Sequence, residues 1–444
     1  MPRPIYSLFM RFGSSTQSLR PRVFRSMSTT LPKATGTTNQ HFSLDADGKE
    51  VVDLSFQSEG IGLPAEKGYG WAQLEFGEKI GRDQRYTITR KLGWGKNSST
   101  WLAWNEILNK YVAVKLLTGH ATDLHERKMA WEEEALKRLT FPSESDNCVH
   151  ILEYFTMKGR GSAGSHLCFA MPLYGGDVGS LIQSRTSPSP LPLVKRILLH
   201  LLRGIAFAHE RGIVHTDLKF DNVLFTTPAT TRDIEKWIKE DPPRRNPPEL
   251  SSDGVIRSAV SQPMKLPSEE EALRATYVLA DFGCALPSGR HAHCNITPVL
   301  LRAPEVLLGG EWDTPADIWS FGCLAYELVT NEVLFQYRTY DDFSLTATEN
   351  LLYQMMFHAC EEFEPDQLRV CPLAGEYFNN NCELKKEPTL GRWPVHELIA
   401  EHKLLSDEEC LAAGAFIQRC LRLNPENRAT AKDLLQDEWL RGVD

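Results

Sequence analysis

The sequence predicts an α+β fold of two lobes, a small β-rich lobe followed by a larger, mostly helical lobe. From residue 86 to about 171, apolar and polar residues alternate, as in YTITRKLGWG, STWLAW and YVAVKLL, which is the pattern of half-buried strands. After residue 179 long apolar helices dominate, as in PLVKRILLHLLRGIAFAHERG, where Gly212 is a candidate C-cap. We therefore expect the small lobe over residues 83–172 and the large lobe over residues 173–444.

Three further segments complete the expected organisation. HERKMAWEEEALKRL predicts one helix with Met129, Leu136 and Leu139 on its buried side. Residues 45–82 are expected to form a linker. Residues 226 to about 276 include KEDPPRRNPPELSSDG, which is rich in proline, serine and charge. This composition predicts an irregular insertion in the large lobe.

Composition excludes several classes of protein. The chain of 444 residues is 42% hydrophobic, and no apolar run approaches the roughly 20 residues of a membrane helix. Its net charge of −9 argues against direct nucleic-acid binding and suits basic protein partners. The ten cysteines form no CxxC pair, so a reducing, intracellular compartment is expected. We expect a monomer without a membrane segment.

The first 44 residues differ from the rest of the chain because they carry six Lys and Arg and no acid. This composition is typical of a mitochondrial transit peptide. Prolines at positions 2, 4 and 21 disfavour the amphipathic helix that such a peptide needs, so a basic disordered tail is the alternative. Cytoplasm and nucleus are the favoured locations, with the mitochondrion as the alternative.

The stretch IVHTDLKFDNVLF places polar groups between two apolar flanks. Asp217 can act as a general base, Lys219 can reach a transferred phosphate, and Asn222 can offer a neutral oxygen to Mg²⁺. The apolar flanks would hold the loop in place. These are the groups that phosphoryl transfer requires, since the protein mainly positions the reactants and offsets charge.

Four other segments supply matching groups in chain order. LGWGKNSST places Gly93 and Gly95 in a turn between strands, where backbone N–H groups can cover phosphates. VAVK places Lys115 on the next strand, and Glu132 on the following helix can pair with it. ADFG offers Asp281 as a second magnesium ligand. Each of these motifs alone often occurs by chance. Their occurrence in this order, followed by RAPE, DIWSFGC and NPENRAT, is the protein-kinase signature.

From about residue 70 onward the chain resembles the SR-protein kinases, a branch of the CMGC group, in a short form of the fungal type. The resemblance is carried by RKLGWG, by VHTDLK with Thr in place of the common Arg, by DTPADIWSFGCLAYEL, and by GRWPVHELI with ENRATAKDLLQDEWL. It implies a bilobal protein-kinase fold. It also implies a serine/threonine kinase that uses ATP and Mg²⁺ on Arg/Ser-rich proteins of mRNA processing.

The resemblance also assigns roles to individual residues. Asp217 and Lys219 would be catalytic, and Asn222 and Asp281 would bind the metal. Glu132 is preferred over Glu133 as the partner of Lys115, because that choice keeps Leu136 and Leu139 at core spacing. Glu305, Asp317 and Arg428 would be structural. The expected ATP-binding residues are Leu92, Gly93, Trp94, Gly95, Lys96, Ser98, Thr100, Ala113, Lys115, Glu132, the gatekeeper Met171, Pro172, Tyr174 and Leu224.

Some positions depart from the common kinase pattern. Thr216 replaces the Arg that binds a phosphorylated activation loop, which predicts constitutive activity. Phe220 replaces a proline, and Pro298 replaces a threonine that bonds the catalytic residues. A catalytically weak or inactive kinase-like scaffold is therefore the alternative function. A kinase of small molecules is a third possibility, against which the complete RAPE segment argues.

Substrate docking is expected on the helix that includes TENLLYQMM. In the related family, acids on this helix draw in Arg-rich segments. Glu349 matches one of these acids, while Met356 stands where the family has a second. Asp341 and Asp342 lie nearby in a less certain register. We therefore expect Glu349 to contribute to docking, with a modest gain from long Arg tracts.

Overall fold

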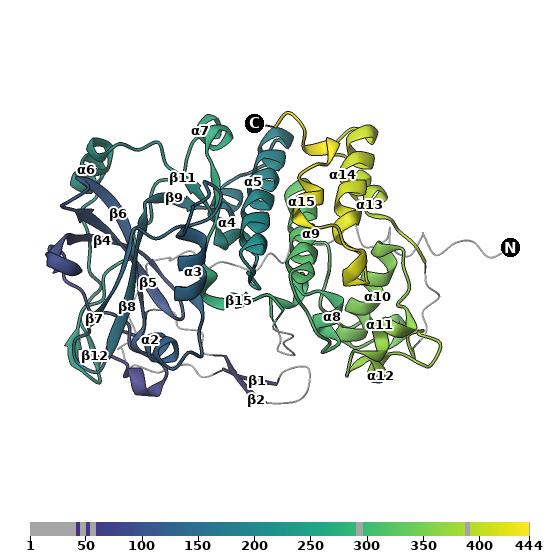
Figure 1. Cartoon of the computed structure of the whole chain (residues 1–444), viewed down its shortest axis with the longest axis horizontal. Helices are drawn as coiled ribbons and strands as arrows, with labels where there is room; N and C mark the ends of the chain where they lie inside the picture. The colour runs from purple at the N-terminus through teal and green to yellow at the C-terminus, as the bar shows by residue number, and fades with distance from the viewer. Residues whose placement is uncertain (1–40, 45–49, 54–58, 290–295, 387–390, 444) are drawn as a thin grey trace.

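The computed structural model describes residues 41–44, 50–53, 59–289, 296–386 and 391–443 (Figure 1). Residues 1–40 of the tail expected over residues 1–44 lie outside these ranges. The two-lobed α+β architecture is confirmed, with a sheet on one side and a group of helices on the other. A short hairpin, β1 (His41–Leu44) and β2 (Glu50–Asp53), precedes the lobes. Within the described ranges, no helix combines the length and the apolar character needed to cross a membrane.

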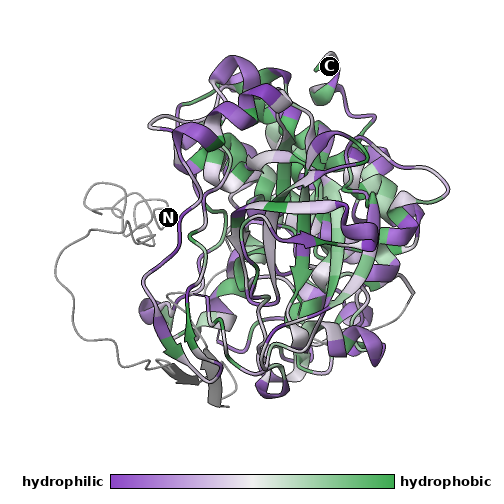
Figure 2. Ribbon diagram, turned by 90° about the vertical axis from the view of Figure 1, so that its left-hand side faces the viewer, coloured by the Kyte–Doolittle hydropathy of each residue, from purple (hydrophilic) through white to green (hydrophobic). Residues whose placement is uncertain are grey.

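The small lobe is built on one antiparallel six-stranded sheet. Apolar residues of its strands form one buried cluster, and the ribbon in Figure 2 shows green, hydrophobic strands next to purple, hydrophilic loops and helices. Trp101 and Val114 are paired neighbours in this core and are 1% and 0% exposed. The strands in spatial order are β3 (Lys79–Ile80), β4 (Tyr86–Trp94), β5 (Ser98–Asn105), β6 (Lys110–Leu117), β8 (Ser165–Pro172) and β7 (Glu153–Lys158).

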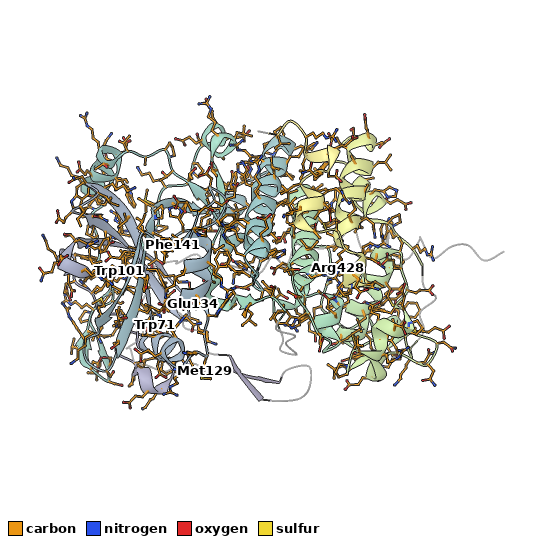
Figure 3. The ribbon with its side chains drawn as sticks, viewed as in Figure 1. Trp71, Trp101, Met129, Glu134, Phe141 and Arg428 are labelled. Carbon is orange, nitrogen blue, oxygen red and sulfur yellow. The ribbon has the colours of Figure 1, made fainter. Side chains whose placement is uncertain are left out.

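The prediction of a single helix around Met129 is wrong. The chain forms two helices, α2 (Gly119–Glu126) and α3 (Glu132–Thr140). Between them Lys128 adopts a left-handed conformation with φ of 59°, which ends the first helix. Met129 consequently lies on the surface with 71% exposure (Figure 3), while Leu136 and Leu139 are buried as expected.

The large lobe is mostly helical. The helix expected before Gly212 is α5 (Leu191–Glu210), and Gly212 adopts the left-handed φ of 67° that suits the end of a helix. Short strands lie next to the catalytic loop: β9 (Tyr174–Asp177), β10 (Ile213–Val214), β11 (Val223–Thr226), β14 (Tyr277–Leu279) and β15 (Leu286–Pro287). The other helices are α4 (Val178–Gln183), α8 (Pro304–Leu307), α9 (Pro315–Thr330), α10 (Ala347–Ala359), α11 (Pro365–Arg369), α12 (Ala374–Tyr377), α13 (Val395–Glu401), α14 (Asp407–Cys420) and α15 (Ala431–Leu434).

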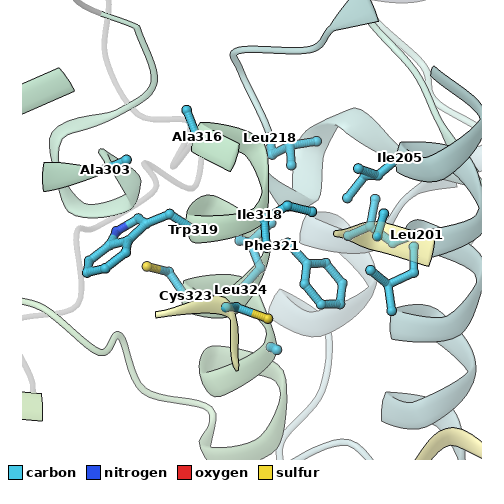
Figure 4. Close-up of a cluster of buried hydrophobic side chains, with 14 of the residues drawn as sticks. Leu201, Ile205, Leu218, Ala303, Ala316, Ile318, Trp319, Phe321, Cys323 and Leu324 are labelled. Carbon is cyan, nitrogen blue, oxygen red and sulfur yellow. The ribbon is translucent and has the colours of Figure 1, made fainter. Parts of the chain in front are cut away.

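The core of the large lobe anchors the catalytic loop. Leu218, which lies between Asp217 and Lys219, is 0% exposed. Its side chain lies with Ile205 of α5 and Ile318 of α9 in one hydrophobic cluster (Figure 4). Because burying a leucine side chain contributes about 1.5–3 kcal/mol, this contact holds the two polar neighbours at the surface of the lobe.

The expectation of a linker up to residue 82 is wrong for its second half. Residues 59–80 pack on the sheet, where Trp71, Ala72 and Leu74 are at most 3% exposed. The local sequence has no strand or helix periodicity, and its burial depends on contacts with the distant sheet. The small lobe therefore begins well before residue 83.

The expectation of an irregular insertion is wrong. It contains α6 (Thr231–Glu240), a hairpin of β12 (Glu249–Ser251) and β13 (Gly254–Ile256), and α7 (Glu269–Arg274). Helix α6 packs against the small lobe, where Ile234 and Trp237 form a buried cluster with Leu102 (Figure 1). Arg90 stacks on the Trp237 ring at 3.8 Å. The polar composition of the whole insertion conceals this amphipathic stretch, TRDIEKWIKE.

Candidate active site

Lys115 occupies the centre of the interlobe site. Strand β6 presents it, and its ammonium pairs with Glu132 of α3 and with Oδ1 of Asp281 at 2.9 Å. Glu133 instead pairs with Lys137 one helical turn further on. The structure thus brings Lys115 together with Glu132 and Asp281, which follow it by 17 and 166 residues in the sequence.

The charges of these groups reinforce one another. Burial disfavours the charged ammonium of Lys115, but Asp281 and Glu132 outweigh burial and raise its pKa. The Lys115 ammonium in turn lowers the pKa of Asp281 to about 2. Lys115 is therefore a permanent cation and Asp281 a permanent anion near neutral pH, as phosphate contact and metal binding require.

The catalytic loop places Asp217, Lys219 and Asn222 around one point. The Lys219 ammonium donates to Oδ2 of Asp217 at 2.7 Å. Nδ2 of Asn222 donates to the backbone oxygen of Asp217 at 2.8 Å and to Oδ2 at 3.1 Å. Asn222 is 4% exposed, so these bonds orient it firmly. The Asp217 carboxylate is thereby held in a single position at the mouth of the site.

Asp317 supports the loop from beneath. It is fully buried on α9 and accepts the backbone N–H groups of His215 at 2.8 Å and Thr216 at 2.9 Å. Its Oδ2 also lies 2.9 Å from Nε2 of His209. Burial alone would raise the pKa of Asp317, but these hydrogen bonds and the nearby histidines lower it below the usual value. The strained left-handed φ of 66° at Thr216 is held by these contacts.

The expected adenine-contacting residues line the hinge side of the site. The sheet register places Ala113 opposite Met171 and Thr100 opposite Lys115. Ala113 is buried, whereas Met171, Pro172 and Tyr174 of the hinge and Leu224 of β11 are half-buried. The remaining expected contacts lie in or next to the β4–β5 turn: Leu92, Gly93, Trp94, Gly95, Lys96 and Ser98.

The donor set suits a nucleotide with magnesium. A Cβ added at Gly93 or Gly95 would meet nothing within 4 Å, so the turn leaves room for phosphates. Among the described residues, no cluster of three or more His, Cys, Asp or Glu side chains could hold a metal. Mg²⁺ usually takes one or two carboxylates and completes its shell with phosphates and water. Asp281 and the Oδ1 of Asn222 fit this pattern.

A buried ion pair stabilises the large lobe behind the site. Arg428 binds Glu305 through two bonds of 2.6 Å, and both side chains are at most 3% exposed. Arg428 also donates to the backbone oxygens of Arg422 and Pro315. Figure 3 places Arg428 among the helices of the large lobe. These bonds satisfy the guanidinium group that burial would otherwise leave unpaired.

The candidate docking residue Glu349 is engaged in contacts within the lobe, and its role in substrate docking stays a prediction. Its carboxylate accepts the N–H of Thr346 at 2.7 Å in the capping box of α10, and it pairs with Lys386 at 2.9 Å. Met356 is 4% exposed, so a charge introduced there would enter the core and not a groove. A cavity of about 710 Å³ beside α10 is bordered instead by the exposed carboxylates of Asp341 and Asp342.

Three acids near the catalytic base had escaped the sequence analysis. Asp177 of α4's N-cap and Asp221 of the catalytic loop approach each other across Gly179, where an added Cβ would lie 2.6 Å from Asp221 Oδ1 and 3.1 Å from Asp177 Oδ1. Burial, then Glu332 and Asp221, raise the pKa of Glu327 to about 7. No described ion pair involves Asp177, Asp221 or Glu327. Because the three acids are far apart in the sequence, only Asp221, within KFDN, could have indicated this cluster.

Comparisons with known proteins agree with this geometry. The protein kinase domain family matches residues 86–239 and 266–440, leaving the middle of the insertion unmatched. Serine/threonine-protein kinase SRPK of Physarum polycephalum is 29% identical over 87% of this chain and 93% of its own length. Protein kinase dsk1 of Schizosaccharomyces pombe is 25% identical over 97% and 95%, respectively. SRSF protein kinase 3 of Mus musculus is 24% identical over 80% and 86%.

The family match covers well over half of the chain, and these relatives align with nearly all of it. The lysine–glutamate pair, the catalytic loop and Asp281 occupy one site between the two lobes. The chain belongs to the protein kinase family, as a serine/threonine kinase similar to the SR-protein kinases.

Proposed function

We propose that this kinase transfers the terminal phosphoryl group of ATP, with Mg²⁺, to serines of Arg/Ser-rich proteins, and that it needs no activation-loop phosphorylation. The chain's own groups account for the chemical step. Asp217 accepts the proton of the substrate hydroxyl, and Lys219 offsets charge beside it. Lys115 neutralises phosphate charge, and the bound metal would offset the rest through Asn222 and Asp281.

The observation that carries the choice of substrate is the acidic cluster of Asp177, Asp221 and Glu327. Asp177 and Asp221 approach each other across Gly179, next to the loop of the catalytic base. Burial, followed by repulsion from Asp177, raises the pKa of Asp221, and burial, followed by repulsion from Glu332 and Asp221, raises the pKa of Glu327. An arginine of the substrate would relieve both effects, because a guanidinium offers paired donors to carboxylates. The name of the relative SRSF protein kinase 3 supports the same substrate class.

We expect arginine-dependent activity to change with pH. Because burial and the neighbouring acids raise the pKa of Glu327 to about 7, this side chain gains its charge as the pH rises through 7, and only the charged form attracts arginine. The kcat/KM for an Arg/Ser peptide should therefore rise as the pH increases through 7, by up to about tenfold between pH 6 and 8. Glu327→Gln should lower kcat/KM for this peptide and flatten the rise. Steady-state kinetics across this range provide the measurement.

A peptide with glutamine in place of each arginine is the matched control for this experiment. Its kcat/KM should be low in both proteins and should not depend on Glu327. If wild type prefers a proline-directed peptide, or if Glu327→Gln leaves the Arg/Ser profile unchanged, the proposed substrate class is wrong. Loss of activity on all peptides would instead favour the scaffold alternative.

Activity without loop phosphorylation is supported by contacts of Thr216. Its hydroxyl donates to the backbone oxygen of Cys284 at 2.7 Å, and its backbone oxygen accepts the N–H of Thr297 at 3.0 Å. Neutral hydrogen bonds thus join the catalytic loop to both ends of the activation segment. In kinases with an arginine at this position, a phosphate group makes that link.

We therefore expect phosphatase-treated enzyme to retain its full rate on Arg/Ser peptide. Thr216→Ala should lower kcat several-fold, since it removes one of these bonds. Mass spectrometry would verify that the treated enzyme carries no phosphate, and initial rates would be compared before and after treatment. A large loss of rate that an upstream kinase restores would contradict constitutive activity.

A further inference from the structure

The segment before the sheet contacts the glycine-rich turn directly. Trp71, which is 1% exposed, donates its indole Nε1–H to the backbone oxygen of Gly95 at 3.0 Å. Its ring also meets Trp94 edge to face, with centroids 6.2 Å apart. Figure 3 shows Trp71 and Trp101 within the small lobe. A single buried side chain therefore holds both the backbone and a side chain of the turn.

This bond decides which way one peptide of the turn faces. A trans peptide directs its C=O and N–H in opposite directions. Holding the Gly95 oxygen on the Trp71 side consequently directs the N–H of Lys96 away from Trp71. Glycine has little preference for one backbone conformation, and nothing lies within 4 Å of a Cβ added at Gly93 or Gly95. Within the turn, the N–H of Gly95 donates to the backbone oxygen of Ser98 at 2.8 Å, while the Gly95 oxygen is held from outside the turn by Trp71.

The segment that carries Trp71 is itself fixed at several points. The backbone oxygens of Gly70 and Tyr69 accept the N–H groups of Gly119 at 2.8 Å and His120 at 3.0 Å, at the start of α2. At the other end, Glu59 forms a fully buried ion pair with Lys91, two residues before Gly93. Trp71 is therefore presented by a rigid support that joins the glycine-rich turn to α2.

We propose that Trp71 is a positioning residue for nucleotide binding, which holds the glycine-rich turn with the N–H of Lys96 directed at the phosphates. The inference rests on the proposed use of ATP. It predicts that removing the indole N–H affects the affinity for nucleotide more than the chemical step, because the groups that react remain in place. A residue that only fills the core would lower stability and leave nucleotide affinity unchanged.

The test compares Trp71→Phe with Trp101→Phe. Trp101 is equally buried in the same lobe, and its Nε1–H donates to Ser99 Oγ at 3.0 Å. Trp71→Phe should raise KM for ATP about threefold to tenfold, the effect of losing one hydrogen bond, with kcat changed less than twofold. Trp101→Phe should leave KM for ATP unchanged. Trp71→His, which keeps a ring N–H, provides a second variant that should recover part of the affinity.

Amide hydrogen exchange of residues 93–98 without nucleotide gives an independent reading. Exchange should be faster in Trp71→Phe than in wild type and unaffected in Trp101→Phe. If wild type fails to bind ATP, the proposed function fails, yet exchange still decides whether Trp71 holds the turn. Unchanged exchange, or a KM that rises equally in both phenylalanine variants, would overturn the role of Trp71.

Discussion

Asp217→Asn should lower kcat by a factor on the order of 10² or more while nucleotide binding persists, because it removes the general base and no phosphate contact. In the structure the carboxylate is held by Lys219 and Asn222, and the buried Leu218, which follows Asp217, anchors the loop. An asparagine preserves the size of the side chain but cannot accept the hydroxyl proton. Initial rates on Arg/Ser peptide and calorimetric binding of ATP with Mg²⁺ measure the two effects separately.

Asp123→Asn is a suitable control for this variant. Asp123 lies on α2 in a solvent-exposed pair with Arg127, so its loss should leave both measurements unchanged. Equal, background-level phosphate transfer by folded wild type and Asp217→Asn would contradict catalysis by this site. That outcome would favour the kinase-like scaffold.

Arg428→Gln should lower the free energy of unfolding by about 3–5 kcal/mol, because it leaves the carboxylate of Glu305 buried without its partner. The two bonds of 2.6 Å and the near-zero exposure of both side chains place this pair in the interior. Burying an unpaired charge costs far more than losing a surface pair. Urea denaturation monitored by circular dichroism would measure the change.

Arg441→Gln is the matched control, since Arg441 and Glu438 form an exposed pair with side chains 70% and 84% accessible. It should change stability by at most about 1 kcal/mol. The double variant Glu305→Gln with Arg428→Gln should recover part of the loss, because no lone charge remains. A loss in Arg428→Gln no greater than that of Arg441→Gln would show that the buried pair contributes little.

The sequence was most informative where the chemistry depends on short, ordered motifs. Strand alternation and glycines placed Lys115 and the β4–β5 turn, and core spacing in α3 favoured Glu132 over Glu133, which instead pairs with Lys137. The catalytic loop could be assigned because its polar groups stand between two apolar flanks within one short motif. One side chain points into the core, as Leu218 does, while its neighbours face the site.

Tertiary structure alone decided features that depend on a distant partner. The Trp71 indole meets an oxygen 24 residues away, and α6 buries Trp237 against strands far earlier in the chain. Glu349 looked available for docking, yet Lys386 neutralises it from 37 residues away. Periodicity reports whether a segment has an apolar face, because that property arises from local backbone geometry. Periodicity does not show which distant group that face will contact or which group will pair with a given charge. Those contacts form only when the chain packs into its tertiary structure.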